Sequence, residues 1–190
     1  MENDFFFYPW VYFQFHAGAR PSEASALTWA DVDLERGTVS VNKSRNMGTE
    51  AATKTANSER IIPVDGRMVE ILKLLPSRDL GLQYVFVGKR GEPMSKKWAE
   101  HNWSGPLKKL GIRHRKFYAT RHTFITEMVI AGQNLKGIAD YVGTSVTMIE
   151  ADYCARMALT THRTVIAQPS EKGLSHMVAG PGFEPGTSRL

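Results

Sequence analysis

Six side chains in this sequence have the types that cleavage of a phosphodiester requires. Without a metal ion, such a cleavage needs a nucleophile, positive charge on the non-bridging oxygens, a proton donor for the leaving oxygen, and alignment of these groups. Arginine suits the second task because its planar guanidinium is always charged and can donate to two phosphate oxygens. The candidates for these tasks are Arg20, Lys54, Tyr118, Arg121, Thr144 and Tyr153.

Most of these candidates lie in three short motifs. Gly18-Ala-Arg-Pro-Ser-Glu23 contains the first arginine, and Tyr118-Ala-Thr-Arg-His-Thr123 contains the second. The candidate nucleophile, Tyr153, lies in Met148-Ile-Glu-Ala-Asp-Tyr-Cys-Ala-Arg156. In this order, the motifs resemble those of the catalytic domain of the tyrosine recombinases, the phage integrase family.

The resemblance implies a fold and an activity. The fold would be mainly α with a small antiparallel β-sheet (α+β). The activity would be site-specific DNA recombination or integration, in which Tyr153 cleaves a strand, forms a 3′-phosphotyrosine and releases a 5′-hydroxyl that is later rejoined. Lys54 would protonate the departing oxygen, and no metal or other cofactor is implied. The implied partner is double-stranded DNA at an attachment site, bound by a homo-tetramer.

The resemblance also predicts the domain organisation. Residues 1–157 would form the catalytic domain, without the N-terminal core-binding domain that completes the DNA clamp in this family. Residues 158–190 would form a C-terminal extension, disordered from about residue 175, because that part is rich in Gly, Pro and Ser and lacks hydrophobic periodicity. Two other functions stay open: a catalytically silent DNA-binding remnant of a decayed integrase, and a topoisomerase that relaxes supercoils by related chemistry.

Two site positions differ from the commonest family pattern. Tyr118 stands where a histidine is usual, and Thr144 stands where histidine or tryptophan is frequent. Tyr118 can donate a hydrogen bond to a phosphate, but the pKa of a phenol suits base catalysis at neutral pH poorly. Thr144 can bind a phosphate oxygen, and it can equally cap the helix that follows.

Three neighbouring residues have more than one interpretation. Glu23 can orient the guanidinium of Arg20, or it can serve as a favourable charge at a helix N-terminus. Lys43 competes with Lys54 for the role of general acid. His122 follows Arg121 directly and points about 100° away from it on a helix, so we expect a structural hydrogen bond from His122.

Positive charge is concentrated in one part of the chain. The net charge is +5, yet eight basic residues lie between Lys96 and Arg121 with one acid, Glu100, so this segment carries 8 − 1 = +7. Such a segment favours a polyanion, because neutralised phosphates release their counterions. A solvated helix face is the alternative explanation. The candidate DNA contacts are Lys108, Lys109, Arg113, Arg115 and Lys116.

The N-terminal apolar run, Phe5–Phe15, predicts a buried helix over 5–17 and is too short to span a bilayer. We therefore expect no membrane association. The single cysteine, Cys154, excludes an intramolecular disulfide framework and indicates a cytoplasmic protein. No paired-cysteine or HExxH pattern is present, so we expect no zinc site.

The remaining sequence predicts mostly helices. We expect strands over 38–41 and 59–64, with a polar connection over 42–58 that carries Lys54. A helix that starts after Ser95 would be interrupted at Gly105-Pro106. The other expected helices span 21–28, 65–75, 119–131, 134–142 and 145–157.

Overall fold

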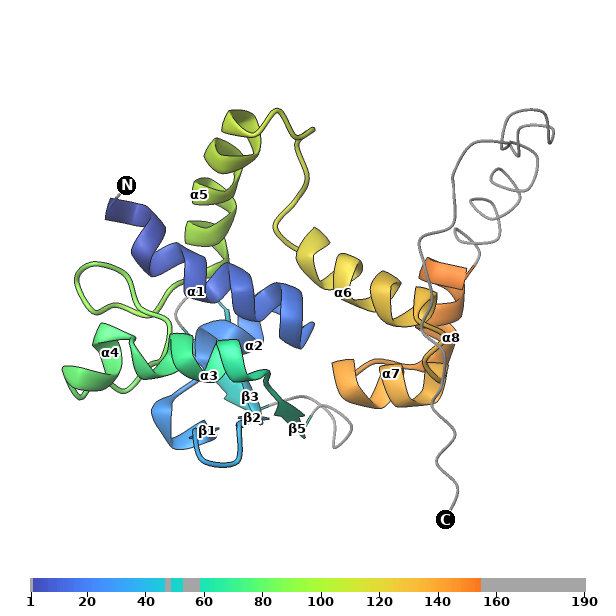
Figure 1. Ribbon diagram of the computed structural model, residues 1–190, viewed down its shortest axis with the longest axis horizontal. Helices are drawn as coiled ribbons and strands as arrows, with labels where there is room; N and C mark the ends of the chain where they lie inside the picture. The colour runs from blue at the N-terminus through green and yellow to red at the C-terminus, as the bar shows by residue number, and fades with distance from the viewer. Residues whose placement is uncertain (1, 47–48, 53–58, 155–190) are drawn as a thin grey trace, which may run out of the picture. The chain divides into compact units, whose positions relative to one another are not determined.

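The computed structural model describes residues 2–46, 49–52 and 59–154, which belong to one compact unit, Met1–Ala155 (Figure 1). Lys54 and the C-terminal extension lie outside the described residues. The helices are α1 (Glu2–Ala17), α2 (Pro21–Ala26), α3 (Gly66–Lys73), α4 (Pro76–Asp79), α5 (Lys96–Lys109), α6 (Ala119–Ile130), α7 (Leu135–Val142) and α8 (Val146–Ile149), with a 3-10 turn η1 (Trp29–Asp31) and a π-helix η3 (Glu150–Cys154).

Two small antiparallel sheets complete the fold. The first has the order β1 (Val32–Asp33), β2 (Thr38–Val41), β5 (Arg60–Pro63), and pairs Val39 with Ile62. Alternation along β2 and β5 turns those two side chains into the core. The expected class, mainly α with a small antiparallel sheet, is confirmed.

The second sheet lies within the polar connection expected over 42–58, where no strands were predicted. β3 (Lys43–Asn46) and β4 (Thr49–Ala52) form a hairpin within that stretch. Strand pairing uses backbone donors and acceptors, so polar side chains on a half-exposed ribbon do not oppose it.

The expected buried N-terminal helix is confirmed, and α1 supplies much of the main core. Trp10 and Phe13 are almost fully buried, and the ring centroids of Trp10 and Phe117 lie 5.5 Å apart. Gly18 follows α1 with a φ of 58°, and a Cβ there would lie 2.3 Å from the Phe124 ring. Only glycine therefore allows α1 to pack this closely against α6. None of the described helices has the length and apolarity to cross a membrane.

The expected interruption of α5 is wrong, because the helix continues through Pro106. A proline removes its own N–H donor and crowds the carbonyl four residues earlier, which leaves the other helical bonds available. Packing opposes a break here, since Ala99 and Leu107 on either side of the proline are both buried.

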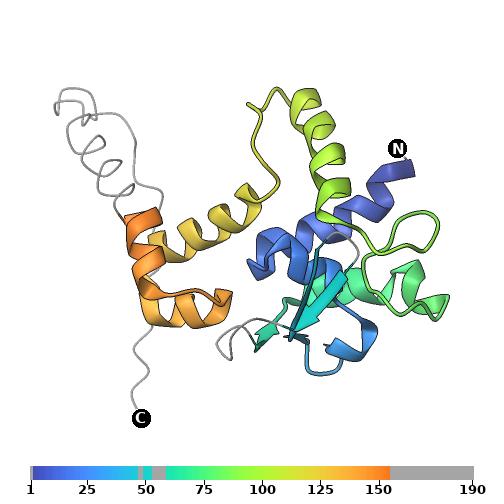
Figure 2. The same cartoon turned by 180° about the vertical axis from the view of Figure 1, so that it is seen from behind.

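A second apolar cluster joins α6, α7, α8 and η3, and includes Phe124, Ile138, Ile149 and Tyr153. Figure 2 shows these helices grouped together, with α6 next to α1. Of the helix expected over 145–157, the described part consists of the four-residue α8, which passes directly into the π-helix η3, and residues 155–157 lie outside the described residues. The wider π turn changes which side chains face inward, and Tyr153 points into this cluster.

Candidate functional site

Three arginines from distant parts of the chain gather around Glu23. Arg20 precedes α2, Arg60 begins β5 and Arg121 lies on α6. Glu23 is 2% exposed and accepts hydrogen bonds from Arg20 Nη1 at 2.7 Å and from Arg60 Nη2 at 2.8 Å. Its carboxylate also accepts from the backbone N–H of Arg20 at 2.8 Å, so it both caps α2 and orients Arg20. The two interpretations of Glu23 are therefore both correct.

The C-terminal end of α7 fixes two of these arginines. Arg20 Nη2 donates to the Gly143 carbonyl at 2.6 Å, and Arg60 Nε donates to the Tyr141 carbonyl at 2.7 Å. The last carbonyls of a helix lack intrahelical donors and carry partial negative charge, so they suit guanidinium groups. Gly143 has a φ of 67°, and a Cβ there would lie 2.9 Å from Arg60 Nη1. Glycine at this position thus allows the arginines to approach the backbone.

Arg121 is 2% exposed and donates from Nη1 to the Gly18 carbonyl at 2.7 Å. Burial lowers the pKa of Arg121 to about 10; the charges of Arg20 and Arg60 add to this, while Tyr118 and Glu23 act in the opposite direction. The group is still protonated at pH 7. Three guanidiniums and one carboxylate leave the cluster with a charge of 3 − 1 = +2, which favours binding of an anion.

Arg60 was not predicted as a site residue. Strand alternation places Arg60 on the same face as the buried Ile62. This two-residue periodicity is the feature of the sequence that could have indicated an inward-facing Arg60. An arginine that points inward requires a counter-charge or acceptors. Nothing in the local sequence indicates that those would be Glu23 and the end of α7.

The candidate nucleophile contacts a residue that was expected to be only structural. Tyr153 is 8% exposed, and its hydroxyl lies 2.5 Å from His122 Nδ1. The His122 ring in turn meets the Tyr118 ring edge to face, with centroids 5.1 Å apart. Among the described contacts, the Tyr153 hydroxyl is thus paired with His122. The expected hydrogen bond of His122 is present, but its partner is the candidate nucleophile.

Thr144 does not cap α8, so this part of its interpretation is wrong. The cap is Ser145, whose hydroxyl accepts from Met148 N–H at 3.2 Å. The Thr144 N–H donates to the Ala139 carbonyl at 2.9 Å and closes the end of α7. Thr144 is half-buried and directly follows Gly143, whose carbonyl accepts the hydrogen bond from Arg20.

Lys43 is held in a structural ion pair. Its Nζ lies 2.6 Å from Asp31 Oδ2 and 3.2 Å from Thr28 Oγ1. Burial alone would raise the pKa of Asp31, but hydrogen bonds from Lys43, Thr28 and Asn42 lower it overall. Lys43 therefore has a partner that stabilises β3 against η1.

The basic segment borders a cleft that reaches one of the candidate site residues. The five predicted DNA contacts are all exposed. Two of them, Arg115 and Lys116, line a cleft of about 520 Å³. The lining consists of Lys96, Glu100, Trp103, His114, Arg115, Lys116, Phe117 and Tyr118. Positive charge thus extends along the surface to the start of α6.

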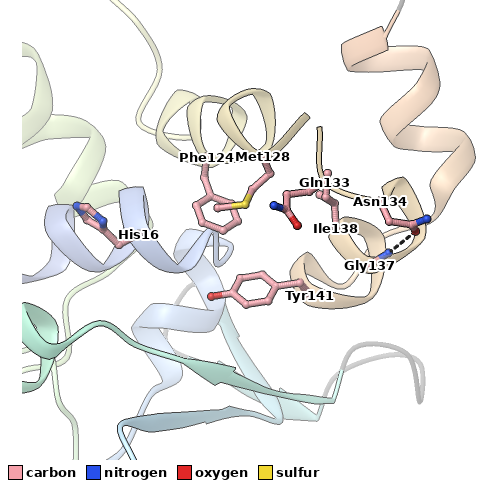
Figure 3. A pocket seen from close by; sticks show the side chains of 8 residues that line it. All are labelled: His16, Phe124, Met128, Gln133, Asn134, Gly137, Ile138 and Tyr141. Atoms are coloured by element: carbon pink, nitrogen blue, oxygen red, sulfur yellow. Dashed lines mark hydrogen bonds between the residues drawn. The ribbon is translucent and has the colours of Figure 1, made fainter. Parts of the chain in front are cut away.

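A second cavity, of about 360 Å³, lies between α1, α6 and α7 (Figure 3). Phe124 and Met128 of α6 face Ile138 and Tyr141 of α7 across it, and His16 comes from the end of α1. Burial raises the pKa of Tyr141 to about 12. None of the five candidate site residues within the described part of the chain lines this cavity.

The described domain is mainly helical with a small antiparallel sheet, and its arginine cluster has the positive charge that binding of an anion such as a phosphate requires. The chain belongs to the phage integrase family, since the model of that family matches residues 8–157. The "Tyrosine recombinase XerC-like" protein of Caldanaerobacter subterraneus subsp. tengcongensis is 26% identical over 165 residues, 73% of this chain and 42% of that protein. "Prophage integrase IntR" of Escherichia coli is 30% identical over 157 residues, 69% of this chain and 38% of IntR. The chain thus spans about two fifths of the length of these relatives.

Solved structures share the fold. An integrase of the Tn1549 transposon in complex with a circular intermediate DNA has a TM-score of 0.69 and 22% identity, over 82% of this chain and 58% of that one. A lambda integrase tetramer bound to a Holliday junction has a TM-score of 0.52 and 16% identity, over 74% of this chain and 41% of that one. These likenesses confirm the mainly helical fold.

Proposed function

We propose that this chain is the catalytic part of a site-specific DNA recombinase or integrase that breaks and rejoins strands through a 3′-phosphotyrosine at Tyr153. The observation that carries the proposal is the buried cluster of Arg20, Arg60 and Arg121 with one carboxylate, Glu23. Its charge of +2 exceeds that of one phosphodiester, so a bound phosphate remains in a positive environment.

In the proposed reaction, Arg20 and Arg121 stabilise the charge that develops on the non-bridging oxygens. Their guanidiniums are already anchored to the Gly143 and Gly18 carbonyls, so little reorganisation is needed when the phosphate binds. Tyr118, next to Arg121, donates a hydrogen bond to the phosphate, and Thr144 binds one of its oxygens. Lys54, outside the described residues, protonates the 5′ oxygen as it leaves.

The proposed partner is double-stranded DNA at an attachment site. Exposed Lys108, Lys109 and Arg113 would contact its backbone, and Arg115 and Lys116 would continue these contacts into the cleft beside Tyr118. Recombination exchanges strands between two duplexes, which four protomers would hold, as in the lambda integrase tetramer on a Holliday junction. We propose 1–157 as the catalytic domain and a cytoplasmic location.

A silent DNA-binding remnant is the second candidate, and one observation favours it. Tyr153 is 8% exposed and its hydroxyl lies 2.5 Å from His122 Nδ1, so the described structure holds the candidate nucleophile in a contact within the protein. A remnant would bind DNA without forming a covalent bond.

A suicide-substrate assay separates the two candidates. Nicked, end-labelled duplexes from the presumed attachment site are incubated with protein and EDTA, and products are resolved on a denaturing gel. The recombinase proposal predicts a covalent adduct that is lost in Tyr153→Phe. The matched control is Tyr8→Phe, because the exposed Tyr8 hydroxyl contacts only the exposed Arg67 among its described hydrogen-bond partners. DNA binding without any adduct would support the remnant, and relaxation of supercoiled plasmid without site preference would support a topoisomerase.

A further inference from the structure

The hydroxyl of Tyr153 lies against the imidazole of His122, which has no role in the reaction proposed above. His122 Nδ1 is 2.5 Å from this hydroxyl, and the two ring centroids are 5.5 Å apart. Tyr153 is buried in the second apolar cluster, while His122 is half-buried on α6. We propose that His122 accepts the proton of Tyr153 as Tyr153 attacks the phosphate, a role that rests on the function proposed above.

A proton acceptor is needed because a phenol with an ordinary pKa near 10 is a weak nucleophile at pH 7. The arginines are permanently charged and cannot accept a proton. Tyr118 and Thr144 are hydroxyl groups that suit base catalysis poorly at this pH. A neutral imidazole, with an ordinary pKa near 6.5, accepts a proton readily and is the usual group for this task. His122 therefore supplies the proton acceptor that Arg20, Tyr118, Arg121 and Thr144 do not provide, while Lys54 is assigned to the 5′ oxygen.

The proton balance of the step is complete. As the Tyr153 oxygen forms a bond to phosphorus, its proton moves to Nδ1 of His122, which becomes an imidazolium. The bond from phosphorus to the 5′ oxygen breaks, and Lys54, the proposed general acid, protonates that oxygen. In rejoining, the 5′-hydroxyl attacks the phosphotyrosine and gives its proton to Lys54, while the His122 imidazolium returns a proton to the Tyr153 oxygen.

The surroundings of His122 fix the imidazole for this role. Tyr118, the residue that precedes α6, lies one turn earlier in the chain, and its ring meets the imidazole at an interplanar angle of 71°. This contact limits rotation of the imidazole while Nδ1 faces η3. Among the described ring contacts of His122, the titratable partners are Tyr118, which precedes α6, and Tyr153 of η3.

The contact is tested without DNA by NMR of protein labelled with 15N-histidine. An acceptor Nδ1 requires the tautomer with its proton on Nε2, so we expect an unprotonated Nδ1 at pH 8. We also expect the His122 shifts and titration to change in Tyr153→Phe. A proton on Nδ1, or shifts unaffected by Tyr153→Phe, would overturn the proposal whatever the protein does to DNA.

The chemical role is tested with the suicide substrate across pH 5.5–9. The wild-type rate of adduct formation should fall in acid as one group protonates. In His122→Leu the rate should fall by about 100-fold or more, and the acid limb should disappear. His122→Asn places an acceptor oxygen near the position of Nδ1 but cannot take a proton, so it should lose a similar factor. His16→Asn is the matched control, since the exposed His16 stacks on Tyr12 beside Asp65.

Each other outcome is informative. A wild-type rate in His122→Asn would mean that His122 only positions Tyr153, and a faster rate in His122→Leu would mean that it restrains Tyr153. Both would overturn the proton-accepting role and leave the recombinase proposal intact. No wild-type adduct, with the NMR contact present, would instead refute the proposed function and with it any catalytic role for His122.

Discussion

Replacing Glu23 by glutamine removes the carboxylate that Arg20 and Arg60 share and leaves the side-chain shape almost unchanged. Oε1 accepts from Arg20 Nη1 at 2.7 Å, and Oε2 accepts from Arg60 Nη2 at 2.8 Å. An amide has only one acceptor oxygen, so in either orientation its NH₂ group meets a guanidinium donor. The three arginines would then have lost this counter-charge.

The structure sets the expected size of the effect. Glu23 and Arg60 are 2% and 7% exposed, and removing one partner of a buried ion pair costs about 3–5 kcal/mol. Arg20 is 33% exposed, so solvent screens its share. We expect a loss of about 3 kcal/mol, which lowers Tm by about 6–12 °C in a chain of this size.

Urea unfolding of wild type and Glu23→Gln at several pH values measures this loss. Burial would raise the pKa of Glu23, but the hydrogen bonds and charge of Arg60, with the hydrogen bonds from Arg20, hold it below the ordinary value of 4.5. A carboxylate with a lowered pKa stabilises the fold above its unfolded pKa and loses this effect as the pH falls through the folded pKa. The difference between the two proteins should therefore be full at pH 7 and shrink below pH 4.5.

Two further variants test whether the lost stability comes from the buried ion pairs of Glu23. Glu70→Gln is the matched control: Glu70 pairs with Lys73 at 2.9 Å but is 68% exposed, so its loss should stay below about 0.5 kcal/mol. Adding Arg60→Met to Glu23→Gln should recover part of the stability, because the unpaired buried charge is removed. A loss in Glu23→Gln below about 1 kcal/mol at pH 7, or one that persists unchanged in acid, would refute the reasoning.

Three other predictions follow from the same contacts. Gly143→Ala should lower the free energy of unfolding by about 1–2 kcal/mol because of the positive φ, and by more because the new Cβ displaces Arg60. In the control Gly137→Ala, on α7, the new Cβ meets nothing within 4 Å, so thermal unfolding should show an unchanged or higher stability. Removing the charges of Arg115 and Lys116 together should weaken DNA binding and reduce the slope of the logarithm of the DNA-binding constant against the logarithm of salt concentration by about 2. The control Lys136→Ala breaks an exposed pair with Asp140 and should leave this slope unchanged. Lys43→Met should lower the free energy of unfolding by breaking the pair with Asp31, whereas Lys54→Ala should abolish adduct formation. Loss of the adduct in Lys43→Met but not in Lys54→Ala would make Lys43 the general acid.

The sequence predicted the helices with clear boundary signals. Asp65 and Asn134 cap α3 and α7 through their side chains, and Gly18 and Gly143 follow α1 and α7 with positive φ. Propensity rules failed where tertiary packing decides, since Pro106 is tolerated within α5. The strands β3 and β4 were not predicted, because the hydrogen bonds that pair them are in the backbone and most of their side chains are polar.

The candidate site was predictable only in part. Motifs identify residue types, and they identified Arg20 and Arg121, which the structure places near each other and near Glu23. They do not identify contacts between side chains that are remote in sequence. Arg60 joins the cluster through strand pairing, and His122 meets Tyr153 only because η3 packs against α6. Both contacts depend on the complete fold.

The anchoring of the arginines connects the fold of the domain to its chemistry. Arg20 and Arg60 use the carbonyls at the end of α7, and Arg121 uses the carbonyl of Gly18 after α1. Neutral carbonyls satisfy guanidinium donors without cancelling their charge, whereas each added carboxylate would reduce the +2 charge by one. Glu23 as the shared carboxylate thus allows Arg60 and Arg121 to be buried beside the half-buried Arg20 while the cluster remains positive. A phosphate that binds here relieves the remaining repulsion among the arginines, so phosphate or DNA should stabilise the wild-type fold, and should stabilise Glu23→Gln by a larger increment.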